Sequence, residues 1–562
     1  MASQEGFRGV LKKLDELNEF ERQPVGEDQL QRGLYFAAAF AGEHIAATEF
    51  IIGALFVSLG ANAFDVVVGL MLGNLLAVLS WTFICAPIAI STRLTLYWYL
   101  RRIIGPAGMV VYNLTNAVLY CALGGAMITV AASALRIPFG IPDQVKWYPE
   151  DLRFVLVVFA VGAVVVTLAV LGFKRLAQFS TVCSPWMIVM FMAGAMASLP
   201  LLGNVGSWAD FWKIANEQIW KGPSGSGGGI GFWHIVAFAW ACNLGMHLGL
   251  TDMALFRFAR RSAYGLYSST GMFLGHYLSW ICAGIMGAAA ATVLKKSLIE
   301  LDSGSVATTA LGTLGALTVV VAGWTTANPM LYRSGLAFQV VSPGWPRWRV
   351  TLIAGLITTL FACSPFVFTK MLDFVVVYGL ILLPMGAIVV AEHWLFPLLG
   401  WNRYWASRRG LLFNWPAMFA WIGSVACGLT ASYLGLIHLF FVFIPVWIIA
   451  IVAYVLLAGL YGARGELPDG ADEHATASHH PAAARVPATP SNAENRLYVA
   501  SGIAATLSLV ACLVVPIWIL ASGRTEAKMS VFGVVAGLAT VVYFISSVYW
   551  LAENEKRRTS IS

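Results

Sequence analysis

Residues 34–60 read LYFAAAFAGEHIAATEFIIGALFVSLG. This stretch is long enough and apolar enough to cross a bilayer, which takes about 20 apolar residues. Near its middle it carries Glu43, His44 and Glu49. A charged side chain at bilayer depth costs at least about 2.5–3.5 kcal/mol on insertion scales, so such residues usually mark an ion or substrate path. Glu49 follows Glu43 by six residues, so the two are expected on different helix faces and need not share one site.

The same stretch favours a broken helix. Gly42 precedes two adjacent polar side chains, and the sequence AGEH is a poor helix former. Helices broken at mid-membrane, with freed backbone groups that bind ligand, are typical of transporters. Glu43 lies against the expected break, so it is the stronger functional candidate of the two glutamates.

The composition indicates a polytopic membrane protein. The chain has 562 residues, of which 59% are hydrophobic and 11% charged, whereas soluble domains average about 25% charged residues. Residues 1–32 are charged and lack the short apolar core of a cleavable signal peptide, so the first span is the expected insertion signal. The net charge of +7 is spread over short loops. We therefore expect no nucleic-acid partner, and no motif predicts a cofactor or an enzyme.

Hydropathy predicts an all-α integral membrane protein with about fourteen spans. Lys and Arg cluster after the even-numbered spans, as at Arg101 and Arg102 after the second and Arg333 after the eighth. Because cytoplasmic loops are enriched in Lys and Arg, both termini are expected in the cytoplasm, at the plasma membrane or the bacterial inner membrane. Residues 462–496 are rich in Pro, Ala, Asp and His and are expected to form a disordered cytoplasmic loop.

Two further predicted spans carry polar groups at their centres. In the eighth, Thr325 and Thr326 precede Pro329, which cannot donate to the helix ladder. Hydroxyls and freed carbonyls are hard oxygen ligands suited to an alkali cation, although Thr also bonds to carbonyls of its own helix. The sixth span could line a pocket, or its polar groups could serve helix–helix hydrogen bonding; these residues are Trp240, Cys242, Asn243, Gly245 and His247. His234 and His276 lie nearer the predicted span ends, and structural roles are expected for both.

Four stretches in chain order resemble the nucleobase–cation symporters of the purine–cytosine permease type, which include hydantoin and allantoin permeases. The resemblance covers roughly residues 30–460, and its most specific stretch is WTTANPMLYRSGLAF (324–338); the others are MLGNLL (71–76), TDMALFRFARR (251–261) and FNWPAMFAWIGSVACG (413–428). It implies a LeuT-like fold with two inverted five-helix repeats in which helices one and six are broken. The repeats would be residues 33–202 and 203–398, after a cytoplasmic segment 1–32. Spans eleven and twelve would occupy 399–461, and two extra spans 497–562.

The resemblance also implies an ion site. In sodium-coupled members, main-chain oxygens at the break in helix one and a Ser/Thr group on helix eight hold the ion. The matching positions here are Gly42, Ile45, Ala322, Thr325 and Thr326. Both Thr hydroxyls are retained, and Ala322 offers only its carbonyl. The coupling ion is therefore expected to be Na⁺ or H⁺.

The substrate pocket implied by the resemblance departs further from the family. Leu123 stands where relatives stack a flat ring on Trp, and Tyr120 stands at a Gln-like position one turn away. On helix six, Asn243 takes the place of the second aromatic, flanked by Cys242 and Gly245, and Ala327 replaces a helix-eight Asn. The aromatic sandwich is thus missing unless Tyr120 or Trp240 replaces it. Glu43 takes the place of an apolar residue.

These features predict a secondary active transporter for cation-coupled uptake of a small nitrogenous solute, such as a nucleobase or related N-heterocycle, by alternating access. An alternative is a symporter or uniporter for a cationic amine or guanidino compound that pairs with Glu43, because an ion pair offsets the desolvation of both charges. Glu43 could instead be protonated and couple transport to protons. A remote alternative is a non-transporting membrane sensor. The protein is expected to work as a monomer in the lipid membrane.

Overall fold

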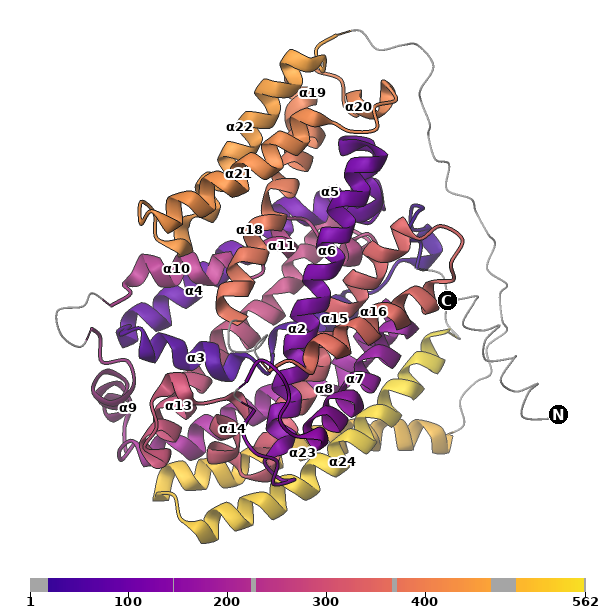
Figure 1. The fold of residues 1–562 in the computed structure, drawn as a ribbon. Helices are drawn as coiled ribbons and strands as arrows, with labels where there is room; N and C mark the ends of the chain where they lie inside the picture. Colours follow the sequence, from indigo (N-terminus) through magenta and orange to yellow (C-terminus); the bar gives the residue numbers. More distant parts are fainter. Residues whose placement is uncertain (1–18, 145, 224–228, 366–370, 466–491, 560–562) are drawn as a thin grey trace.

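The computed structural model describes residues 19–144, 146–223, 229–365, 371–465 and 492–559. Within these ranges the regular structure is helical (Figure 1). Most of the predicted cytoplasmic segment 1–32 and of the predicted disordered loop 462–496 lies outside the described residues.

The first span is broken, as AGEH predicts. Helix α2 (Gly33–His44) and helix α3 (Glu49–Ser58) meet at an angle of 55°. The helix ends at Ile45, whose φ of −90° and ψ of 68° are not helical. The break therefore follows Glu43 and His44 directly, and both side chains lie at the end of α2.

The sixth predicted span is broken twice. Helices α10 (Phe232–Ala241), α11 (Leu244–His247) and α12 (Met253–Phe256) follow one another with short non-helical links. Asn243 and Leu250 in these links have left-handed φ values of 67° and 65°. Such conformations cost about 1–3 kcal/mol for residues other than glycine and cluster at functional sites. The broken helix six implied by the family resemblance is present.

Helix α15 (Thr313–Val341) runs through the centre of the bundle. Of its most apolar 18-residue stretch, 83% is buried. Helices from both halves of the chain surround it (Figure 1): α6 (Leu96–Arg136), α7 (Leu152–Leu171), α8 (Phe173–Ser198) and α16 (Arg347–Ala362). The second span comprises α4 (Ala63–Ser80), the π-helical η2 (Trp81–Cys85) and α5 (Ala86–Thr92). The seventh comprises the π-helical η6 (Thr270–Ser279) and α13 (Trp280–Leu294), and the short α14 (Ser303–Leu311) precedes α15.

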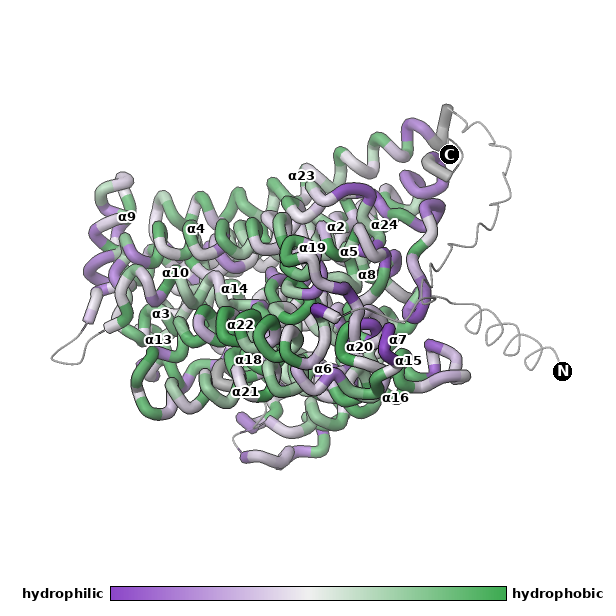
Figure 2. Tube along the Cα trace, turned by 90° about the horizontal axis from the view of Figure 1, so that it is seen from above, coloured by the Kyte–Doolittle hydropathy of each residue, from purple (hydrophilic) through white to green (hydrophobic). Residues whose placement is uncertain are grey.

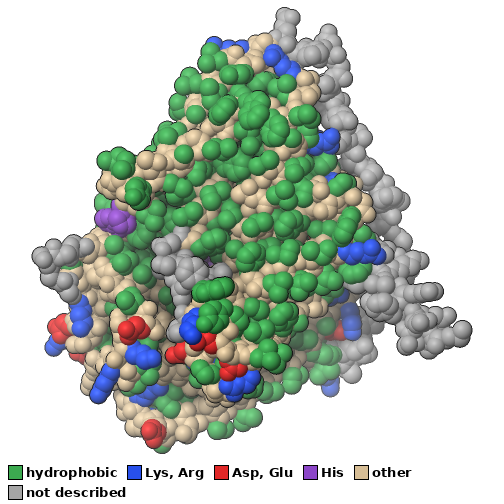
Figure 3. Space-filling model, in the orientation of Figure 1, with side chains coloured by type: hydrophobic (Ala, Val, Ile, Leu, Met, Phe, Trp, Pro, Cys, Tyr) green, Lys and Arg blue, Asp and Glu red, His purple; other side chains and the backbone are tan. Residues whose placement is uncertain are grey.

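Two helix pairs flank this bundle on opposite sides (Figure 1). Helices α21 (Trp415–Tyr433) and α22 (Phe443–Tyr461) pack on α18 (Met371–Val390), whereas α23 (Asn492–Ser522) and α24 (Glu526–Thr559) pack on α8. Hydrophilic residues gather at two opposite ends, around α9 (Trp208–Ile214) and the C-terminal part of α24 (Figure 2). Hydrophobic side chains cover the broad face between the charged edges (Figure 3). This distribution fits a membrane-embedded bundle.

Among the described residues, ten helices are long and apolar enough to cross a membrane, or eleven if α2 and α3 count as one bent span. Each of the fourteen predicted spans coincides with a helix or a broken helix, but the count of fourteen stays a prediction. One sequence assignment is wrong. Arg333 does not lie in a loop after the eighth span, because it is part of α15, which continues to Val341. Its side chain is completely buried.

The hairpin of α23 and α24 is joined to the bundle by specific hydrogen bonds. Trp186 Nε1 donates to Thr540 Oγ1 over 2.9 Å, and the Tyr543 hydroxyl donates to the Val182 carbonyl over 2.7 Å. In the turn between the two helices, Arg524 donates to carbonyl oxygens at the C-terminal ends of α8 and α14, those of Ala197, Thr309 and Ala310. A cation there also interacts favourably with both helix dipoles.

We expect Arg524→Ala to lower the thermal stability of the protein in detergent. Hydrogen bonds to a charged group contribute about 1.5–3 kcal/mol, and the variant leaves two helix ends without this partner. Lys528→Ala is the matched control, because the described contacts of the Lys528 ammonium group stay within the hairpin: it donates to Ser522 and Gly523 and lies 5.1 Å from the Trp518 ring centre. Equal melting temperatures for the two variants would show that the helix-end contacts of Arg524 contribute nothing.

Candidate ion and substrate site

Three charged side chains meet beside the break in the first span. Arg333 Nη1 and Nη2 donate to the two carboxylate oxygens of Glu43 over 2.6 and 3.0 Å. The Arg333 Nε donates to Asp252 Oδ1 over 3.1 Å, and Nη2 also reaches this oxygen. All three side chains are 2% exposed or less. We call Glu43, Arg333 and Asp252 the charged triad. It joins α2, α15 and the link before α12.

Aromatic groups complete the surroundings of the triad. Trp81 Nε1 donates to Asp252 Oδ2 over 2.6 Å. The Arg333 guanidinium lies 5.9 Å from the centre of the Tyr120 ring, whose hydroxyl is 2.7 Å from Thr251 Oγ1. Two carboxylates and one guanidinium carry a formal charge of −1. Because an uncompensated buried charge is costly, a cation or a proton close by would stabilise this arrangement.

The charged triad changes the interpretation of Glu43. Arg333 already binds both of its carboxylate oxygens. A cationic substrate would therefore have to displace Arg333 before it could pair with Glu43. The role of Glu43 in substrate binding stays a prediction, and the structure supplies a partner that hydropathy had placed in a loop.

The predicted ion-binding elements lie next to each other. Thr326 Oγ1 donates to the Glu43 carbonyl over 3.0 Å and so ties α15 to the end of α2. Thr325 Oγ1 donates to the Ala322 carbonyl over 3.0 Å, the bonding within one helix that is the alternative to ion binding. Gly42 packs directly on α8, where a Cβ would come within 2.4 Å of Ser180 Oγ. That hydroxyl is buried and has no hydrogen-bond partner among the described residues.

The contact of Thr326 with the Glu43 carbonyl thus brings together two elements that carry predicted ion ligands, the end of α2 and α15. That Gly42, Ile45, Ala322, Thr325 and Thr326 hold an ion together stays a prediction. The unpartnered Ser180 hydroxyl is an additional hard oxygen that the sequence did not indicate. The charged triad begins one residue away, at Glu43.

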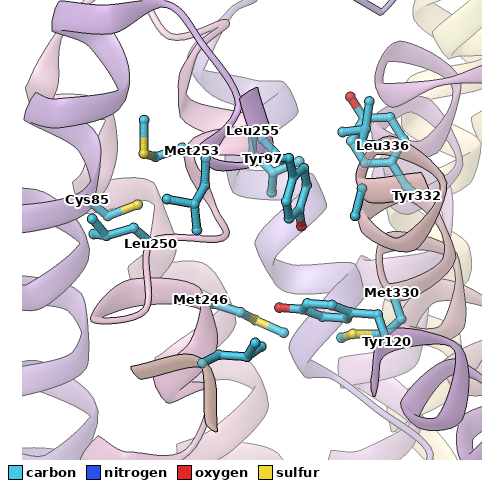
Figure 4. Packing of buried hydrophobic residues seen from close by; sticks show 14 of the residues in the cluster. Cys85, Tyr97, Tyr120, Met246, Leu250, Met253, Leu255, Met330, Tyr332 and Leu336 are labelled. Carbon is cyan, nitrogen blue, oxygen red and sulfur yellow. The ribbon is translucent and has the colours of Figure 1, made fainter. Parts of the chain in front are cut away.

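Tyr120 is one of the predicted substrate positions and is fully buried. Figure 4 shows its ring beside Met246 of α11 and Met330 of α15. Tyr378 of α18 meets the Tyr120 ring edge-on, with ring centres 5.9 Å apart. A Cβ at Gly245 would lie 3.5 Å from the Tyr378 ring. Tyr120 and Tyr378 therefore form an aromatic pair beside Gly245.

The remaining predicted substrate positions differ in their surroundings. Leu123 and Ala327 are buried on α6 and α15, which pack together. Trp240 donates to Ser80 Oγ over 3.0 Å and its ring packs on Phe443 of α22; its part in the substrate site stays a prediction. Cys242 lines a mainly apolar cavity of about 30 Å³ between α3, α10 and α18, and the adjacent Asn243 side chain has a buried Nδ2 with no partner among the described residues.

A second buried carboxylate lies on the other side of the break. Trp280 Nε1 donates to Glu49 Oε2, and His276 Nε2 lies 3.6 Å from Glu49 Oε1. Glu43 and Glu49 thus belong to separate clusters, as their six-residue spacing predicted. His276 does not lie near a span end, because η6 and α13 belong to one helical stretch from Ser262 to Leu294.

No family model and no curated protein matches this chain. Solved structures do. The nucleobase-cation-symport-1 family transporter Mhp1, closed with bromovinylhydantoin bound, has 16% identity and a TM-score of 0.59 over 79% of this chain and 96% of its own. Mhp1 in its inward-facing conformation gives a TM-score of 0.58 at 16% identity, over 79% and 94%. A substrate-bound, outward-open Na⁺-coupled sialic acid symporter gives 0.58 at 12% identity, over 78% and 92%. The fold implied by the family resemblance is confirmed.

Proposed function

We propose that this protein is a secondary active transporter that couples cation entry to the uptake of a small nitrogen-containing solute by alternating access. The observation that carries the proposal is the contact between Thr326 and the Glu43 carbonyl. This contact joins α15, which carries several hydroxyl and carbonyl oxygens, to the broken first span. The charged triad, with its formal charge of −1, lies beside it. A cation bound there would offset this charge and hold α15 against α2.

The shared fold supports the transport cycle. Structures of this fold have been solved in closed, inward-facing and outward-open conformations. In our proposal, residues 33–202 and 203–398 are the two inverted repeats, and the breaks in their first helices surround the site. From the distribution of Lys and Arg we also propose that both termini lie in the cytoplasm and that the protein resides in the plasma membrane or the bacterial inner membrane.

The substrate we propose is a neutral N-heterocycle. Two of the similar structures belong to a transporter of the nucleobase-cation-symport-1 family, one of them with a hydantoin derivative bound. Tyr120 and Tyr378 could offer ring faces to a flat substrate if the ring contact between them opened. A cationic amine or guanidino compound is the second candidate, because the charged triad holds two carboxylates for one guanidinium.

A thermal-shift screen of the purified protein tests the substrate class. Nucleobases, hydantoins, amines and guanidino compounds are added singly, in Na⁺ buffer and in choline buffer. A ligand that binds only the folded state raises the melting temperature by mass action. At one hundred times its Kd, such a ligand raises the free energy of unfolding by about 2.7 kcal/mol. We expect a heterocycle whose effect grows with Na⁺. A melting-temperature shift with amines or guanidino compounds only, unaffected by Na⁺, would favour the second candidate.

A further inference from the structure

We infer that Glu49 and His276, with His44 beside them, form a buried proton-binding site on the far side of the first-span break. The inference deepens the proposed function, since it adds a second ion site to the transport cycle. The carboxylate of Glu49 is 2% exposed, and its only described ionic partner within 4 Å is His276.

The geometry around Glu49 suits one shared proton. His276 Nε2 lies 3.6 Å from Glu49 Oε1, and the Trp280 indole donates to the other oxygen. The His276 ring stacks on the Trp280 ring with centres 4.4 Å apart and an angle of 9°. The separation of His276 Nε2 from Glu49 Oε1 is longer than a hydrogen bond, so transfer requires the two side chains to approach each other. A proton on His276 Nε2 can then pass to Glu49 Oε1, leaving a neutral imidazole and a carboxylic acid. The pair then holds the same proton with no net change in charge.

Nitrogens without partners among the described residues extend the site toward the charged triad. His44 Nδ1 is 2.8 Å from the Phe40 carbonyl, whereas its Nε2 is buried without a partner. His276 Nδ1 is also buried and unpartnered, and the two rings are 5.0 Å apart. Trp81 lies between His44 and the triad, because its ring contacts His44 and its indole bonds to Asp252. Chains of Asp, Glu and His inside membranes are typical of proton relays.

The backbone brings this site close to the break. His276 lies in η6, a π-helical segment, and such segments occur frequently at functional sites. Glycines let η6 approach α2: a Cβ at Gly275 would come within 2.0 Å of the His44 carbonyl, and one at Gly271 within 2.7 Å of His44 Nδ1. His44 and Glu49 lie on either side of the break. A change in the angle of the break therefore changes the distance between His44 and Glu49.

Other ionisable groups surround the pair and are part of its electrostatic environment. Those on the elements packed around it are Glu43 on α2, Cys242 and His247 at α10 and α11, Asp252 before α12, Cys183 on α8, Cys282 on α13 and Arg333 on α15. Glu43, Asp252 and Arg333 are bound to one another in the charged triad. Glu49 has no arginine or lysine partner among the described residues, so a proton shared with His276 would neutralise its buried charge.

Infrared difference spectroscopy of the full-length protein tests the site without any substrate. Lowering the pH should produce the C=O stretching band of a buried, protonated carboxyl, and this band should be lost in Glu49→Gln. Glu392→Gln is the matched control, because Glu392 is also fully buried and is bonded to the Tyr454 hydroxyl instead. The Glu49 band should persist in that variant.

His276→Asn keeps the carboxyl and tests the pairing if Glu49→Gln fails to fold. We expect the band to remain but to appear at a different pH, because a charge within about 4–6 Å of a carboxyl alters its titration. A spectrum unaltered by Glu49→Gln, or an unchanged pH midpoint in His276→Asn, would overturn the inference. The ligand screen is independent of this result, so failure of the transport proposal would be seen there.

Discussion

Arg333→Gln is expected to lower the stability of the protein more than Arg524→Ala does. It removes the guanidinium that lies between Glu43 and Asp252 and leaves two carboxylates buried without a cation. Breaking a buried ion pair by removing one partner costs about 3–5 kcal/mol. The measurement is thermal unfolding in detergent, with ligand binding as the second readout.

Arg136→Gln is the matched control for this prediction. Arg136 also pairs with two carboxylates, Asp143 and Asp302, but the Asp143 side chain is 56% exposed. Exposed ion pairs contribute about 0–1 kcal/mol. The Arg136–Asp302 pair is more buried, at 11% and 21% exposure, but both carboxylates that pair with Arg136 retain some contact with solvent, so the control should lose less stability than Arg333→Gln. The double variant Arg333→Gln with Glu43→Gln should recover part of the loss, because one unpaired carboxylate is removed. Equal losses for both arginines, without recovery, would refute the role of the charged triad.

Replacing Thr325 and Thr326 together with Ala is expected to abolish the dependence of ligand binding on Na⁺. The change removes two hard oxygen ligands and the bond from Thr326 to the Glu43 carbonyl. If any Na⁺ dependence persists, the Na⁺ concentration for half-maximal effect should be at least about tenfold higher, which corresponds to about 1.4 kcal/mol. The thermal-shift response to ligand, titrated with Na⁺ against choline, measures this.

Two further variants separate ion binding from simple loss of a buried hydroxyl. Thr318→Ala alters the same helix, where the buried Thr318 Oγ1 donates to the Leu314 carbonyl over 2.7 Å, and it should keep the Na⁺ response. Thr326→Ser retains a hydroxyl and should keep it as well. An unchanged Na⁺ response in the double Ala variant would remove Thr325 and Thr326 from the ion site.

The sequence predicted the fold well because helix breaks and apolar spans are local properties. The break predicted from AGEH begins at Ile45, directly after this sequence. The six-residue spacing correctly predicted that Glu43 and Glu49 have different surroundings. The partner of Glu43 was missed because its position depends on how helices pack. Arg333 was counted as a loop charge, although the apolar residues from Leu336 to Val341 show that the span continues beyond it.

His276 and Asp252 were missed for related reasons. A π-helical segment changes which residues face inward, and hydropathy does not reveal it, so His276 was expected near a span end. Asp252 follows a left-handed residue, Leu250, in a link that no helical period describes. The substrate positions on α6 and α15 came from the resemblance alone, and their role is still a prediction.

The contacts of Arg524 also bear on the order in which the protein matures. Arg524 and Ala310, whose carbonyl it binds, are 214 positions apart in the chain. At about 5–20 residues per second, translation takes roughly 10–40 s to travel that distance. During this interval the carbonyls at the ends of α8 and α14 lack their hydrogen bonds from Arg524. The Val182 carbonyl likewise lacks its hydrogen bond from Tyr543. The bundle that contains the two proposed ion sites therefore acquires its final supports only after its own helices have been synthesised.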